Sequence, residues 1–166
     1  MYVGTILLVE RSPLVLSIGY RLIFGEFEME QKLIPGELEE LERQFAVKPD
    51  DVEVVLALAN AYAEVERWEE AVKAYKLAIQ LDPENGDLYN RLGVVFVSID
   101  DPIEAEESYL KAIDCSPEES RFYFNLGELY QHQRRMSNAK YVFGKCLQLS
   151  NDPDERAEVR EKLLFM

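Results

Sequence analysis

The sequence has few of the residues that build metal-binding or redox centres. It contains two cysteines and one histidine among 166 residues. Cys115 and Cys146 lack the CxxC spacing of zinc and thiol–disulfide sites, and His132 has no cluster of ligands around it. We therefore expect no metal and no cofactor. Both cysteines fall late in predicted helices and are expected to stay reduced, which fits a cytoplasmic location.

Basic residues are also in short supply. The chain has 18 Lys and Arg residues against 32 Asp and Glu residues, a formal net charge of -14. This charge repels phosphate backbones and anionic membrane surfaces, so it disfavours nucleic acid and membrane as partners. Otherwise the composition is typical of one soluble domain. The acidity indicates either a well-solvated helical surface or the attraction of a basic partner.

No stretch has the clean apolar character of a membrane span. The most apolar segment runs from Thr5 to Phe24, but Glu10, Arg11 and Arg21 interrupt it. Each charge at the bilayer centre costs roughly 2.5–3.5 kcal/mol on the insertion scale. The segment also lacks the basic start and the small-residue cleavage site of a signal peptide. We expect neither a membrane anchor nor a cleaved leader.

What the sequence does have is an internal repeat. Val52–Asn85, Gly86–Glu119 and Ser120–Pro153 are blocks of 34 residues that align without gaps. The blocks share columns of leucine, small residues, aromatics and proline. These columns are Leu58/Leu92/Leu126, Ala59/Gly93/Gly127, Tyr62/Phe96/Tyr130, Ala71/Ala105/Ala139, Tyr75/Tyr109/Phe143, Ala78/Ala112/Cys146 and Pro49/Pro83/Pro117.

The alternation of small and large columns has a physical cause. Two antiparallel helices cross closely only where one of them carries a small side chain, and large aromatics then fill the remaining space. One such pair cannot cover its own apolar face, whereas stacked pairs make a continuous core. Asp82-Pro83, Ser116-Pro117, Asp101-Pro102 and Asp152-Pro153 each place a capping side chain before a proline, which predicts four helix starts.

These columns resemble those of the tetratricopeptide-repeat (TPR) family. The resemblance covers about residues 52–153 in three copies, with Ala59 in place of the usual glycine and Asn151 in place of the last proline. It implies an all-α, right-handed solenoid of antiparallel helix pairs.

The flanking segments complete the expected domain, residues 36–166. Leu38, Leu41 and Phe45 are spaced as on one side of a helix that ends before Pro49. This helix is predicted to be the second helix of an incomplete repeat. The charged helix at the C-terminus suits the polar cap that a solenoid needs. The predicted parts are a half repeat at 36–51, repeats at 52–85, 86–119 and 120–153, and a capping helix at 154–166.

Residues 1–35 do not fit the repeat. An apolar, partly β-branched strand followed by a helix is predicted there, and residues 4–25 resemble the start of a response-regulator receiver domain. Arg11 replaces the second of the two acidic residues that hold a metal ion in such domains, and no strand with a phosphoacceptor aspartate follows. The alternative is a hydrophobic element that packs on the first repeat or pairs with another copy.

The resemblance also implies where a ligand would bind, because the first helix of each TPR repeat lines a concave groove. Apolar Leu56, Val94, Val97 and Phe124 then stand where exposure to solvent is expected, with two arginines beside them. This combination favours an extended peptide or a helix with an apolar anchor and an acidic or C-terminal carboxylate group. The alternative is that these side chains are merely solvated or covered by the chain's own ends. The candidate groove residues are Leu56, Asn60, Asn90, Arg91, Val94, Val97, Arg121, Phe124, Asn125 and Glu128.

The predicted function is therefore that of an adaptor or assembly scaffold that binds a partner protein in the groove. Only Asn60 and Arg121 match the Lys and Asn clamp with which some TPR domains bind chaperone tails, so that role is disfavoured. The alternative function is a structural protein that self-associates through its N-terminal element, as a homo-oligomer. We expect no enzymatic activity, since no nucleophile stands beside a base and no carboxylates converge.

Overall fold

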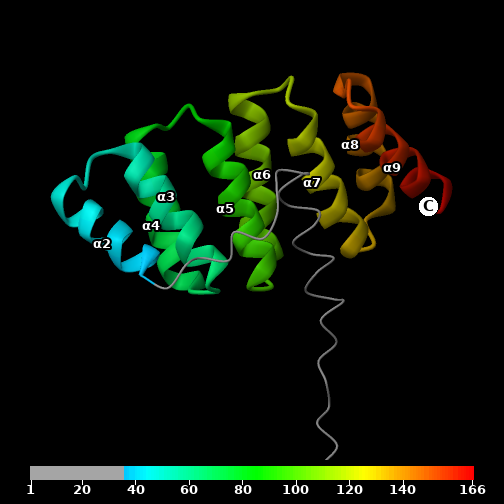
Figure 1. Cartoon of the computed structure of the whole chain (residues 1–166). Helices are drawn as coiled ribbons and strands as arrows, with labels where there is room; N and C mark the ends of the chain where they lie inside the picture. The colour runs from blue at the N-terminus through cyan, green and yellow to red at the C-terminus, as the bar shows by residue number, and fades with distance from the viewer. Residues whose placement is uncertain (1–35) are drawn as a thin grey trace, which may run out of the picture. The chain divides into compact units, whose positions relative to one another are not determined.

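The computed structural model describes residues 36–166, and within that range the chain is built of helices without strands. Figure 1 shows them stacked side by side in chain order. The prediction of an all-helical solenoid is confirmed, while the strand–helix element predicted for residues 1–35 lies outside the described residues. The helices are α2 (Glu37–Val47), α3 (Val52–Glu64), α4 (Trp68–Leu81), α5 (Gly86–Ser98), α6 (Pro102–Cys115), α7 (Ser120–His132), α8 (Met136–Leu149) and α9 (Pro153–Leu164).

The helices pack as pairs with a fixed period. The most extensive contacts join α3 to α4, α5 to α6 and α7 to α8, and weaker contacts join each pair to the next. The first helices of the pairs begin at residues 52, 86 and 120, and the second helices begin at 68, 102 and 136. At the two ends, α2 packs on α3 and α9 packs on α8.

The turn inside each pair repeats the same backbone geometry. Glu66, Asp100 and Arg134 have φ angles of 60°, 60° and 59°, in the left-handed region. The amide of the following residue then donates to a carbonyl five residues back, as from Arg67 to Tyr62 at 2.8 Å. This pattern is the Schellman motif, which ends a helix and satisfies its last carbonyls. The second helix of each pair therefore starts in the same orientation.

Two of the four predicted helix starts are wrong. Asp101 and Asp152 cap α6 and α9 as expected, accepting from the amides of Glu104 and Asp154. Asp82 and Ser116, however, end the helices that precede them, since their amides donate to the carbonyls of Ala78 and Ala112. The next helices begin three residues later than the prolines indicated, with Asn85 and Glu119 at the N-cap positions.

The core within each pair is an aromatic ring set against a small residue. A Cβ added to Gly93 would lie 2.7 Å from Cε1 of Tyr109, and one added to Gly127 would lie 2.5 Å from Cε1 of Phe143. Both distances are too short for real contacts, so a glycine is required at these positions for the ring to pack. The alanine column at Ala71, Ala105 and Ala139 is fully buried. The predicted role of the small columns is thus confirmed.

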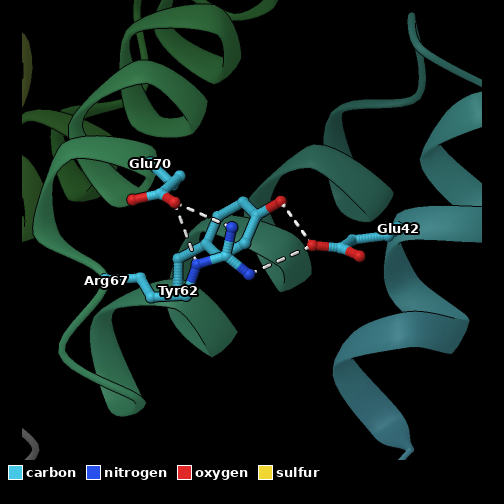
Figure 2. Close-up of polar contacts among 4 residues, drawn as sticks. All are labelled: Glu42, Tyr62, Arg67 and Glu70. Carbon is cyan, nitrogen blue, oxygen red and sulfur yellow. Dashed lines mark hydrogen bonds and ion pairs between the residues drawn. The ribbon is translucent and has the colours of Figure 1, made fainter.

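Polar contacts connect some consecutive helix pairs. We call the place where the second helix of one pair meets the first helix of the next a joint. At the α2–α3 joint, the Tyr62 hydroxyl donates to Oε1 of Glu42 at 3.0 Å, and Arg67 donates to the same oxygen at 3.3 Å (Figure 2). The Arg67 guanidinium also lies 4.6 Å from the centre of the Tyr62 ring and pairs with Glu70 at 2.7 Å. The α6–α7 joint has the same three residue types.

At that joint, Tyr130 donates to Oε1 of Glu106 at 2.8 Å. Arg135 bonds both oxygens of the same carboxylate and stacks 4.2 Å from the Tyr130 ring centre. Arg135 holds the pKa of Glu106 below its ordinary value, although partial burial of the carboxylate opposes the shift. We call these two three-residue contacts, Tyr62–Glu42–Arg67 and Tyr130–Glu106–Arg135, the staples.

The two cysteines differ in burial. Cys146 is buried in α8, Cys115 is half-buried at the end of α6, and both are free thiols. Burial, followed by the nearby Glu155 carboxylate, raises the pKa of Cys146 to about 12. None of the helices between residues 36 and 166 is long and apolar enough to cross a membrane.

Candidate functional site

The candidate site is the side of α3, α5 and α7 that carries the ten groove residues, and we call it the first-helix face. Six of these residues keep at least partly accessible side chains, whereas four are buried. The accessible residues are Leu56, Asn60, Arg91, Val97, Arg121 and Glu128. Val97 is the most exposed apolar residue of the set, at 46%.

The expectation that Val94 and Phe124 face solvent is wrong. Their exposed fractions are 9% and 6%, because neighbouring helices approach closely enough to cover them. Phe124 packs edge-to-face on Phe143, with ring centres 5.9 Å apart. Asn90 and Asn125 are also buried, and Nδ2 of Asn125 donates to Oδ1 of Asn90 at 2.8 Å. These four side chains position α5 and α7 and offer little surface to a partner.

Asn60 lies on α3 and contacts α5 on the first-helix face. Its Oδ1 accepts from the Tyr75 hydroxyl at 2.6 Å and, at 3.5 Å, from the Arg91 guanidinium. Burial raises the pKa of Tyr75 to about 12, against the opposing effect of the Arg91 charge. The tyrosine is therefore a neutral donor at physiological pH, and it fixes the orientation of the Asn60 amide.

Arg121 lies on α7 and reaches back to α5. Its Nη2 is 2.7 Å from Oδ1 of Asp87, and its Nε is 3.8 Å from Glu119. The guanidinium carbon lies 5.4 Å from the centre of the Phe122 ring. With 42% of its side chain exposed, Arg121 is accessible, but its charge is already compensated by acidic neighbours.

Glu128 is covered in part by the C-terminal helix. The Lys162 ammonium, on α9, lies 2.7 Å from Oε1 of Glu128 and 3.5 Å from Glu158. The same nitrogen is 5.7 Å from the centre of the Phe124 ring. Burial would lower the pKa of Lys162, but the two carboxylates outweigh it and the pKa is raised. The charged sequence of the C-terminal helix indicated a polar cap and gave no sign of this contact.

The described residues around this face form no metal-binding cluster. Between residues 36 and 166, no group of three or more His, Cys, Asp or Glu side chains is arranged to hold a metal ion. His132 is exposed at the last residue of α7. The features that distinguish the face are its shape-determining buried residues and the mixed charges along its surface.

Comparison with known proteins decides the family. Three sequence patterns described as tetratricopeptide or TPR repeats match residues 59–99, 86–119 and 108–141, which together cover half of the chain. The chain belongs to the tetratricopeptide-repeat family. No curated protein sequence matches it.

Solved structures agree with this TPR assignment. A crystal structure of the MamA protein is 26% identical, with a TM-score of 0.65 over 69% of this chain and 62% of that chain. This chain therefore spans less than two thirds of that MamA structure. A thermophilic TPR protein of Thermus thermophilus is 24% identical, with a TM-score of 0.69 over 77% of this chain and 72% of that chain. At that identity the second likeness shows the fold alone.

The TPR assignment carries a coarse functional conclusion. The fold is that of a protein–protein interaction scaffold, and TPR repeats are typically non-enzymatic. The family does not specify which surface binds or what it binds, since one fold hosts many functions.

Proposed function

We propose that this TPR scaffold binds a peptide or helix of a partner protein on its first-helix face, with Val97 as the apolar anchor point. The observation that carries the proposal is that Val97 is 46% exposed at the end of α5, between α3 and α7 in the stack. An apolar side chain that becomes buried when the partner binds, inside a rim of polar contacts, is the usual energetic centre of such an interface.

The two arginines of the first-helix face support specificity more than affinity. Arg121 and Arg91 already contact Asp87 and Asn60. A carboxylate of the partner would reach Arg121 by replacing Asp87, so part of its interaction energy offsets a contact that is lost. We therefore expect the apolar anchor to contribute more to binding than an acidic group of the partner.

A matched pair of variants tests the face. Val97→Asp places a charge on the first-helix face, whereas Ile103→Asp places the same charge on α6, where Ile103 is 78% exposed. Both wild-type residues are exposed, so both variants are expected to fold. Each tagged full-length chain is used to capture partners from lysate, and the affinity of a captured protein is then measured with purified components.

The proposal predicts that the partner binds wild type and Ile103→Asp alike, and binds Val97→Asp about ten-fold or more weakly. Circular dichroism and thermal unfolding of both variants serve as controls. Equal binding by the two variants, or loss with Ile103→Asp alone, would reject the first-helix face as the site. Self-association through the N-terminal element stays a prediction, because residues 1–35 lie outside the described part of the chain.

A further inference from the structure

The C-terminal end of the first-helix face contains a cavity of about 310 Å³. It is formed between α7 and the last turns of α9. Phe165, at the end of α9, is 83% exposed, which is unusual for a large aromatic side chain. The lining residues are Gln131, Glu158, Glu161, Lys162 and Phe165.

The charges around this cavity are unbalanced toward the acidic side. Lys162 is the one basic residue of the lining, and it is engaged by Glu128 and Glu158. Glu161 is exposed and makes no ion pair with any residue of the 36–166 region. One carboxylate, an amide and an aromatic ring are thus available to an incoming group.

The same corner already holds one cation in a defined way. The Lys162 ammonium is bonded by two carboxylates and lies near the Phe124 ring, and only 20% of its side chain is exposed. Carboxylate and aromatic face together make a favourable environment for an ammonium or guanidinium group. Glu161 and Phe165 contribute the same two chemical groups to the lining of the cavity, and no cation of the described residues pairs with Glu161.

We propose that this cavity receives a basic side chain, arginine or lysine, of the protein partner. The charge of -14 on the whole chain favours the approach of a basic segment over long range. Arginine fits both groups, because its planar guanidinium stacks on an aromatic ring while it donates to a carboxylate. This inference rests on the proposed function, and it names the chemistry of the partner at one end of the first-helix face.

The test uses two short probes and the full-length protein. The first probe is the blocked tripeptide acetyl-Ala-Arg-Ala-amide, and the second has citrulline in place of arginine, which keeps the shape and removes the charge. Binding is followed through the backbone amide signals of Gln131, Glu161 and Phe165 in NMR titrations at low salt. We expect the arginine peptide to bind about five-fold or more tightly than the citrulline peptide.

Two variants assign the effect to the cavity. Glu161→Gln removes the unpaired carboxylate, and Glu69→Gln removes an equal charge from an exposed position on α4. We expect Glu161→Gln to abolish most of the preference for arginine and Glu69→Gln to leave it unchanged. Equal binding of the two peptides to wild type, or equal effects of the two variants, would overturn the inference.

The outcome is separable from that of the proposed function. If the arginine preference is absent while the partner still distinguishes Val97→Asp from Ile103→Asp, only the basic side chain is rejected. If the preference is present but the partner ignores Val97→Asp, the cavity stands and the first-helix face loses its role as the main binding surface.

Discussion

The contacts inside each helix pair and the contacts between consecutive pairs are specified in different ways. Inside a pair, an aromatic ring packs on a glycine or alanine, and the arrangement recurs at Gly93 with Tyr109 and at Gly127 with Phe143. Between pairs, the α2–α3 and α6–α7 joints have staples, whereas at α4–α5 the ring of Phe96 faces Lys76 at 5.6 Å.

The difference shows which contacts of a solenoid are the same in every repeat and which vary between repeats. The contact within a pair defines the repeat unit, so the same packing of a ring on a small residue recurs in every copy. The contacts at a joint can instead differ from one copy to the next. A change to the shared packing should therefore cost more than a change to a staple.

The largest effect is expected from Gly127→Ala. The new Cβ would lie 2.5 Å from the fully buried Phe143 ring, so the two helices must move apart. We expect the free energy of unfolding to fall by about 1–3 kcal/mol, despite the higher helix propensity of alanine.

The matched control for that variant is Gly144→Ala on α8, where an added Cβ meets no atom within 4 Å. It should raise the free energy of unfolding by about 0.5–1 kcal/mol, since only the propensity changes. Urea unfolding of the full chain measures both. A stable Gly127→Ala protein would show that the packing within a pair is looser than described.

The staples are tested by removing one hydroxyl from each. Tyr130→Phe takes a donor from Glu106, whose side chain is 24% exposed, and should cost about 1 kcal/mol of unfolding free energy. Tyr62→Phe should cost about half as much, because Glu42 is 40% exposed and water replaces the lost bond more easily. The reverse ranking would contradict the role of burial.

The Glu106 staple should also respond to acid. The pKa of the Glu106 carboxyl is lowered in the folded protein, chiefly by the hydrogen bond from Arg135. The carboxylate therefore stabilises the fold at pH values above its ordinary pKa, and this stabilisation is lost as the pH falls through the lowered pKa. The difference in unfolding free energy between wild type and Glu106→Gln should therefore shrink between about pH 5 and pH 3. A difference that is independent of pH would mean that Glu106 is not ionised in the staple.

The smallest effect concerns the joint that lacks a staple. Phe96→Tyr alone should change stability by only a few tenths of a kcal/mol, since Lys76 supplies no acceptor. When Phe96→Tyr is combined with Lys76→Glu, the new hydroxyl has a carboxylate as its hydrogen-bond acceptor. A double-mutant cycle should then show a favourable coupling of about 0.5 kcal/mol. Zero coupling would indicate that the geometry of this joint differs from that of the other two.

The packing within each pair could be predicted from the sequence because its residues recur every 34 positions. The joints could not, since Glu42 and Glu106 do not share a column. Residues 34 positions after them are Lys76 and Lys140, and the position 34 before Glu106 is Val72. A repeat alignment places the two carboxylates in different columns, and only the structure shows that both bond a tyrosine and an arginine.

The candidate site likewise has one part that the sequence predicts and another that only the structure shows. The resemblance to TPR repeats implies ten groove residues on the first helices, but it does not tell which of them the neighbouring helices cover. The expected exposure of Val94 and Phe124 is wrong for that reason. The contact of Lys162 with Glu128 depends on how α9 sits on α7. The charges of α9 alternate in sign along the helix, and that pattern does not indicate which of Arg156, Arg160 and Lys162 faces inward.

The most direct test of the first-helix face is site-specific photo-crosslinking in the full-length protein. A benzophenone amino acid is placed at position 97 in one protein and at position 103 in another, and each is irradiated with the captured partner. The account predicts a partner crosslink from position 97 and none from position 103. A crosslink from position 103 with none from position 97 would contradict it, and would place the binding surface on the second helices.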